Sequence, residues 1–131
     1  MSKPIVAAQL YTLRNQMKTP EDIALGLKKV KQMGYQAVQV SGIGPIDHVH
    51  LKDLVDQEGL EICATHIGWD RLVSDLDGVI KQHQLWNCKY VGLGSMPEKY
   101  RSSKEGYIQF AKEASLVEIK RVWLNCPDPF K

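Results

Sequence analysis

Four short apolar runs alternate along the chain with segments that have helical spacing. The runs are residues 5–11, 37–40, 60–66 and 89–94. Runs that are apolar on both faces are typical of central strands in parallel sheets. Between them, apolar residues recur at intervals of three and four, as on the buried face of an amphipathic helix. The alternation predicts four strand–helix units around a parallel sheet.

The first helix is the most clearly marked of the four. Thr19 is a capping residue, Pro20 occupies the first helical position, and Gly34 stops the helix. The second helix is bounded by Asp47 and Gly59, and a Ser102–Glu105 capping box marks the start of the fourth. In the third, helical spacing runs from Leu72 to Asn87, which is expected to be a left-handed stop.

The pattern changes at Ser115. The apolar residues that follow lack helical spacing, and residues 125–131 contain two prolines that oppose regular structure. We therefore expect residues 115–131 to form an irregular tail. With a shift of one base, permitted codons for residues 116–124 can encode Leu-Leu-Lys-Leu-Lys-Glu-Phe-Gly-Leu, which would complete the fourth helix and begin a fifth strand. We hypothesise that this tail is out of frame and that a frameshift near Ser115 truncated a longer protein.

Composition and charge narrow the class of protein. The chain of 131 residues has ordinary apolar and charged fractions, so residues 1–131 are expected to form a single domain. The net charge of +2, with dispersed Lys and Arg, gives no reason to expect nucleic-acid or membrane binding. We expect neither a membrane span nor a signal peptide. The three cysteines share no C-x-x-C spacing, which favours reduced thiols and a cytoplasmic location.

Polar and aromatic residues stand where the predicted strands end. Gln9 and Tyr11 are at the end of the first strand, Gln39 is near the end of the second, and His66 and Trp69 follow the third. Because the carboxyl ends of parallel strands meet at one edge of a sheet, Gln9, Gln39 and His66 are expected to lie together. For Gln9 and Tyr11, ordinary interior packing is the alternative.

The remaining polar patterns predict no second site. The loop from Ser41 to Pro45 has two glycines but no nucleotide-binding motif, so a tight turn is expected. His48 and His50 would diverge on a helix and cannot bind one metal ion together. No spacing brings three metal ligands together, and no tightly held catalytic metal is expected.

Strand spacing alone permits a small doubly wound sheet or half of an eight-stranded barrel. The chain contains, in order, Gln-Leu-Tyr-Thr-Leu-Arg at 9–14, Gly-Tyr-Gln-Ala-Val-Gln-Val at 34–40, Thr-His-Ile-Gly at 65–68 and Lys-Tyr-Val at 89–91. Together these segments resemble the sugar phosphate isomerase/epimerase family, the xylose-isomerase-like TIM barrels. The resemblance implies four βα units of a parallel (β/α)8 barrel, truncated after the fourth helix.

The resemblance also implies a substrate site. It assigns substrate binding to Gln9, Tyr11, Gln39, His66 and Trp69, with His66 at the hydroxyl groups of a sugar. The family usually has a glutamate where Gln39 stands, which weakens an acid/base role there, and no catalytic residue is assigned.

The chemistry implied is proton transfer next to a carbonyl, assisted by a divalent metal such as Mn or Zn. The family's metal ligands come from strands five to eight, which this chain lacks. The resemblance therefore implies a truncated sugar (phosphate) isomerase/epimerase that is inactive alone and holds no cofactor. The alternative is a non-catalytic α/β domain that binds a small ligand or a partner at its strand tips. A small doubly wound flavin or signalling domain is a third possibility. The acidic cluster or phosphate-binding loop that would indicate such a domain does not occur in the sequence.

The predicted sheet has consequences for association. Four parallel strands from a barrel have two unpaired edges, and the strands at 5–11 and 89–93 are rich in apolar residues. Burying a few hundred square ångströms of such surface, at roughly 25 cal/mol/Å², contributes several kcal/mol. We therefore expect a homodimer.

Overall fold

The computed structural model of the chain describes residues 3–125, and it describes side chains as far as residue 117. The chain divides into two compact units, and the predicted single domain stays a prediction. The first unit contains residues up to Ile67 and the segment Lys81–Gly92. The second contains Gly68–Ile80 and the chain from Leu93 onward.

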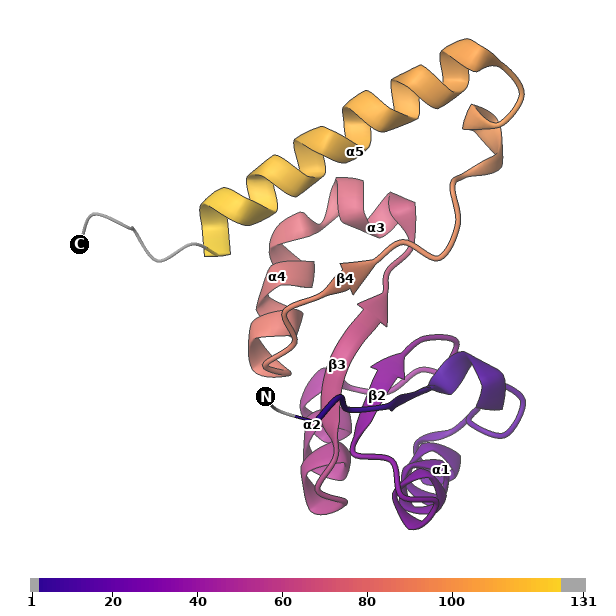
Figure 1. Cartoon of the computed structure of the whole chain (residues 1–131), viewed down its shortest axis with the longest axis vertical. Coiled ribbons are helices and arrows are strands. Elements are labelled where there is room, and N and C mark those ends of the chain that lie inside the picture. The colour runs from indigo at the N-terminus through magenta and orange to yellow at the C-terminus, as the bar shows by residue number, and fades with distance from the viewer. Residues whose placement is uncertain (1–2, 126–131) are drawn as a thin grey trace, which may run out of the picture. The chain divides into compact units, whose positions relative to one another are not determined.

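A parallel sheet is the centre of the first unit (Figure 1). Its strands are β1 (Ala7–Gln9), β2 (Ala37–Val40), β3 (Glu61–His66) and β4 (Val91–Gly92), in the order β1-β2-β3-β4. All neighbouring pairs are parallel, as predicted. Two strands are shorter than expected: β1 gives way to a 3-10 helix at Leu10–Leu13, and β4 has two residues.

The register places the strand-end side chains on one face of the sheet. Gln9 pairs with Gln39, Gln39 pairs with Ala64, and His66 pairs with Gly92. In-register residues of parallel strands point to the same side, and alternate residues share a face. Gln9, Gln39, Ala64 and His66 therefore lie on one face, which we call the inner face. A register shift between Val38 and Gln39 keeps both Ile62 and Thr65 on the opposite face.

Two helices of the first unit begin at side-chain caps. In α1 (Pro20–Gln32), Thr19 and Asp22 form a reciprocal capping box, with both bonds at 3.2 Å. In α2 (His48–Gln57), Asp47 Oδ1 accepts from the backbone N–H groups of Val49 and His50. Both caps were predicted at these residues, and the left-handed stop predicted at Asn87 is confirmed by its φ of 50°.

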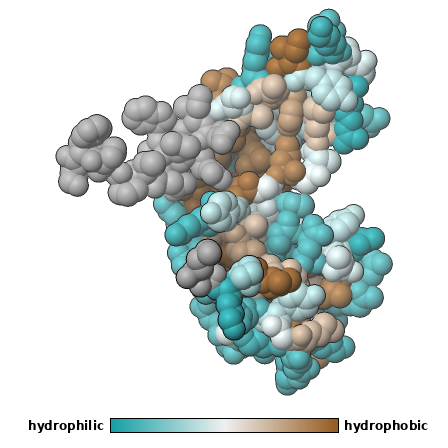
Figure 2. Space-filling view, in the orientation of Figure 1, coloured by the Kyte–Doolittle hydropathy of each residue, from teal (hydrophilic) through white to brown (hydrophobic). Residues whose placement is uncertain are grey.

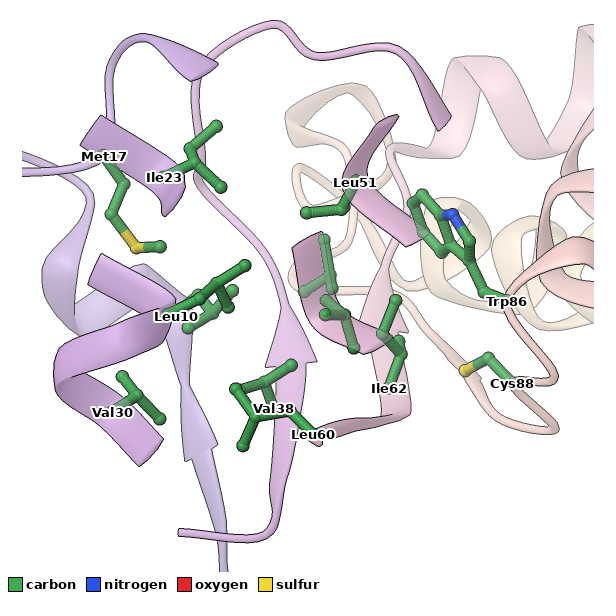
Figure 3. Packing of buried hydrophobic residues seen from close by; sticks show 13 residues of the cluster. Leu10, Met17, Ile23, Val30, Val38, Leu51, Leu60, Ile62, Trp86 and Cys88 are labelled. Atoms are coloured by element: carbon green, nitrogen blue, oxygen red, sulfur yellow. The ribbon is translucent and has the colours of Figure 1, made fainter. Parts of the chain in front are cut away.

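The hydrophobic core of the first unit forms on the side of the sheet opposite the inner face (Figure 3). Val38 and Ile62 contribute from the strands. The buried residues of the two helices are Ile23, Leu27 and Val30 of α1 and Leu51 and Val55 of α2. Burial of this face by the helices leaves the inner face as the side on which polar groups gather.

The helical segment that follows β3 is broken, where one helix was predicted from Leu72 to Asn87. It forms α3 (Trp69–Ser74) and α4 (Leu76–Leu85), separated by Asp75. Asp75 leaves the helical conformation at φ −139°, and its Oδ1 accepts from the N–H of Gly78 at 3.2 Å. The Asp75 backbone thus ends α3, and its carboxylate caps the start of α4.

The last helix, α5 (Lys104–Asn125), corrects two predictions. Its cap is Ser103, whose Oγ accepts from the N–H of Gly106, and not Ser102. The helix also continues past Ser115, where we expected an irregular tail to begin, because neither proline nor glycine occurs between Ser115 and Pro127. The rest of that tail, residues 126–131, lies outside the described residues. Across residues 3–125, no helix combines the length and apolar character that crossing a membrane requires.

Candidate functional site

Three polar side chains lie on the inner face near the carboxyl edge of the sheet. Gln9 is the last residue of β1, Gln39 the penultimate residue of β2 and His66 the last residue of β3. Gln9 and His66 are exposed, and Gln39 is half-buried. The prediction that these three residues lie together on adjacent strands is confirmed by the register.

Much of the hydrogen-bonding capacity of this group is unused. Within the described part of the chain, the side chains of Gln9 and His66 have no hydrogen-bond partner, and Gln39 uses only its Oε1. Amide and imidazole groups offer both donors and acceptors. The edge of the inner face can therefore bind a molecule that has several hydroxyl or carbonyl groups.

His66 is held against the neighbouring strand. A β carbon built on Gly92 would lie 2.9 Å from His66 Cδ2 and 3.4 Å from Nε2, so the ring covers the space above this glycine. The same β carbon would lie 2.9 Å from the carbonyl oxygen of Thr65. The absence of a side chain at position 92 thus makes room for the imidazole.

Gln39 is oriented by a neighbour on the same side of the chain. The hydroxyl of Ser41 donates to Gln39 Oε1 at 2.8 Å. Ser41 is 6% exposed, so this bond is shielded from solvent. From the sequence, Ser41 was predicted only to begin a tight turn, although the spacing of two residues places it on the same side as Gln39.

Tyr11 belongs to the 3-10 helix after β1 and not to the strand itself. Its side chain is 49% exposed, and the guanidinium of Arg14 lies 4.4 Å from the centre of its ring. The ring also packs against Gly42, whose φ of 67° is readily adopted by glycine. Tyr11 therefore lines the loops that follow β1 and β2, and its role in substrate binding stays a prediction.

These two loops are joined by their backbones. The N–H of Gly44 donates to the carbonyl oxygen of Met17 at 2.7 Å. A β carbon on Gly44 would overlap the carbonyl of Lys18. The two glycines of this loop thus serve a tight turn, as the sequence predicted, and close packing, which it did not predict.

Trp69 is a packing residue of the second unit. Its ring contacts Tyr100 at 6.3 Å and Phe110 at 4.8 Å between centres, and it is 6% exposed. The Tyr100 hydroxyl donates to the Glu113 carboxylate, and this bond is the main cause that lowers the pKa of Glu113. The predicted contact between Trp69 and a substrate stays a prediction, with little ring surface exposed.

One polar contact behind the site was missed. His83 was predicted to be a flank residue of its helix, but it is 5% exposed, and its Nε2 lies 2.6 Å from Thr65 Oγ1. Thr65 directly precedes His66 and points to the opposite face. The signal was present in the sequence, since His83 continues the apolar spacing of Val79 and Ile80.

The side chains that the structure describes do not fit a divalent metal. Among them, as far as residue 117, no three His, Cys, Asp or Glu side chains gather closely enough to bind one ion. The two described cysteines are free thiols, and burial raises the pKa of both Cys63 and Cys88. A raised pKa lowers the fraction of each thiol that is present as the reactive thiolate.

Comparison with known proteins gives a structural match. No protein-family model matches the sequence. No curated protein matches it significantly. A crystal structure of a xylose isomerase domain containing protein from Salmonella typhimurium is similar with a TM-score of 0.60 and 14% sequence identity. The match covers 92% of this chain and 48% of the other, so this chain spans about half the length of that protein. The chain has a xylose-isomerase-like α/β fold, with four parallel strands that correspond to half of a barrel.

Proposed function

We propose that this chain is the amino-terminal half of a sugar (phosphate) isomerase or epimerase and that its inner face binds a small sugar or polyol. The observation that carries the proposal is the group of Gln9, Gln39 and His66 at the ends of adjacent parallel strands. In α/β barrels, ligands bind at this end of the strands. Polyols suit such a group because each hydroxyl both donates and accepts.

The role proposed for these residues is binding rather than catalysis. Amide side chains neither gain nor lose a proton appreciably at neutral pH, so Gln9 and Gln39 can orient a ligand but cannot act as general bases. A bound divalent metal would supply carbonyl polarisation in the complete family. Because the described residues do not fit a metal, we derive no step through one and propose that this chain is inactive alone. The corresponding expectation is that calorimetry with Mn²⁺, Co²⁺ and Zn²⁺ finds no stoichiometric micromolar site.

The setting that we propose is the cytoplasm, and the partner is a second copy of the chain. Free thiols at Cys63 and Cys88 support a reducing compartment. The two open edges of the sheet support self-association.

The proposed truncation is tested by sequencing the encoding DNA. A shifted reading frame that continues into a second half-barrel supports the truncation, and the lack of such a frame contradicts it.

Binding is tested by NMR titration with D-xylose, D-fructose and xylitol. Resonances of Gln9, Gln39 and His66 are expected to shift, and Gln39→Ala and His66→Ala are each expected to weaken binding roughly 2- to 10-fold, as for the loss of one hydrogen bond. The matched control is Gln36→Ala, an exposed glutamine before the opposite end of β2. Equal losses in the control, or shifts confined to residues away from the inner face, would contradict the proposal.

A further inference from the structure

We propose that Ser41 is a positioning residue that determines which end of the Gln39 amide meets a ligand, and so makes the site selective for an acceptor oxygen. This inference rests on the proposed binding function. The starting point is the hydrogen bond of 2.8 Å between Ser41 Oγ and Gln39 Oε1. The bond joins a buried hydroxyl to a half-buried amide.

The orientation of the Gln39 amide follows from the requirement of the Ser41 hydroxyl for a hydrogen-bond acceptor. A buried hydroxyl proton requires an acceptor, and in the described part of the chain the one that Ser41 has is Gln39 Oε1. If the amide were reversed, its NH₂ group would donate to Ser41 Oγ, and the proton of Ser41 would lose its acceptor. The arrangement with Oε1 toward Ser41 is therefore favoured.

The consequence is that Gln39 offers its NH₂ group to the inner face. This group has no partner among the described residues, and Gln39 stands in register with Gln9. A ligand atom that meets Nε2 must accept a hydrogen bond, as a carbonyl, hydroxyl, carboxylate or phosphate oxygen does. An ammonium group at that position would face two N–H donors and be excluded.

Substitution of Gln39 by glutamate keeps the shape of the side chain and changes whether it donates or accepts hydrogen bonds. Glutamate has nearly the same size, and the Ser41 hydroxyl can donate to its carboxylate as well. The change replaces the NH₂ group with a second acceptor oxygen. Gln39→Glu should therefore reverse the selectivity of the site without disturbing the Ser41 contact.

The first experiment needs no ligand. Nuclear Overhauser contacts of the Gln39 NH₂ protons are measured in the whole chain, with contacts to Gln9 expected to be stronger than contacts to Ser41. Strong contacts between these protons and the Ser41 side chain would overturn the proposal.

The second experiment uses acetate as an acceptor probe and methylammonium as a donor probe, detected at the backbone N–H resonance of residue 39, which the wild type and every variant share. Acetate is expected to shift it at least threefold more steeply in the wild type than in Ser41→Ala, with rescue by Ser41→Thr. Methylammonium is expected to bind only Gln39→Glu. Equal acetate responses in the wild type and Ser41→Ala would overturn the proposal. Neither probe is a sugar, so the two proposals can fail separately. A sugar titration without binding would contradict the proposed function but would leave the role of Ser41 to be decided by the acetate and methylammonium measurements.

Discussion

The His66 imidazole occupies the space beside Gly92, its register partner on β4, at a distance that leaves no room for a β carbon. Gly92→Ala is therefore expected to displace the ring or the strand and to destabilise the fold by about 1–3 kcal/mol. Urea unfolding would measure the loss, and NMR shifts of His66 would report the ring. Gly68→Ala is the control, since a β carbon there meets no atom within 4 Å. Similar stability of Gly92→Ala and the wild type would mean that the contact is not restrictive.

The buried pair of Thr65 and His83 predicts a second effect on stability. Thr65→Val keeps the shape of the side chain but removes the hydroxyl that faces His83 Nε2 at 2.6 Å. Loss of a buried hydrogen-bond partner costs about 1–3 kcal/mol, and denaturant unfolding would show it. Thr65→Ser keeps the hydroxyl and is expected to lose less. The pair would have no stabilising role if Thr65→Val unfolded at the wild-type midpoint.

The cap of α2 predicts a dependence of stability on pH. The backbone N–H of His50 is the main cause that lowers the pKa of Asp47. A carboxyl whose folded pKa is lowered stabilises the fold above its unfolded pKa of about 4, and this contribution is lost as pH falls through the folded value. Asp47→Ala is expected to lower stability at pH 7 and to flatten the acid limb of a stability–pH curve. Asp47→Asn, which keeps the capping oxygen, should retain most of the stability at pH 7. An unchanged acid limb in Asp47→Ala would contradict this.

The open edge of β1 predicts self-association. Ile5 and Val6, just before the strand, are 58% and 70% exposed, and Figure 2 shows hydrophobic residues reaching the surface among hydrophilic ones. We expect a homodimer in which an edge strand of one copy pairs with an edge strand of the other. Val6→Lys places a charge at this edge and is expected to yield monomers in sedimentation velocity.

The matched control for the dimer is Val73→Lys. Val73 is 57% exposed on α3 and is not part of the sheet, so this change should leave the dimer intact. A wild-type chain that stays monomeric at high micromolar concentration would rule the dimer out.

Local signals explain why some features could be predicted from the sequence and others could not. The caps at Thr19 and Asp47 are hydrogen bonds between residues at most three apart, so the local sequence is enough to predict them. The break at Asp75 and the cap at Ser103 were missed because neighbouring polar residues, such as Ser74 and Ser102, can cap a helix equally well by their chemistry. In the candidate site, the polarity of a parallel sheet was enough to bring Gln9 and Gln39 together. The contact of His66 with Gly92 depends on a register that no pattern of residues specifies.

The backbone bond between Gly44 and Met17 has a consequence for how this edge of the sheet can change in evolution. Loops after the strands of α/β barrels usually vary in length one at a time, because each is attached only to its own strand and helix. Here the loop after β1 and the loop after β2 are packed against each other with no space for a side chain at Gly44. An insertion in either loop would separate that contact unless the other loop changed as well. Relatives of this chain should therefore vary the lengths of these two loops together, and new ligand specificity should arise more readily from substitutions such as those at Gln9 and Gln39 than from insertions.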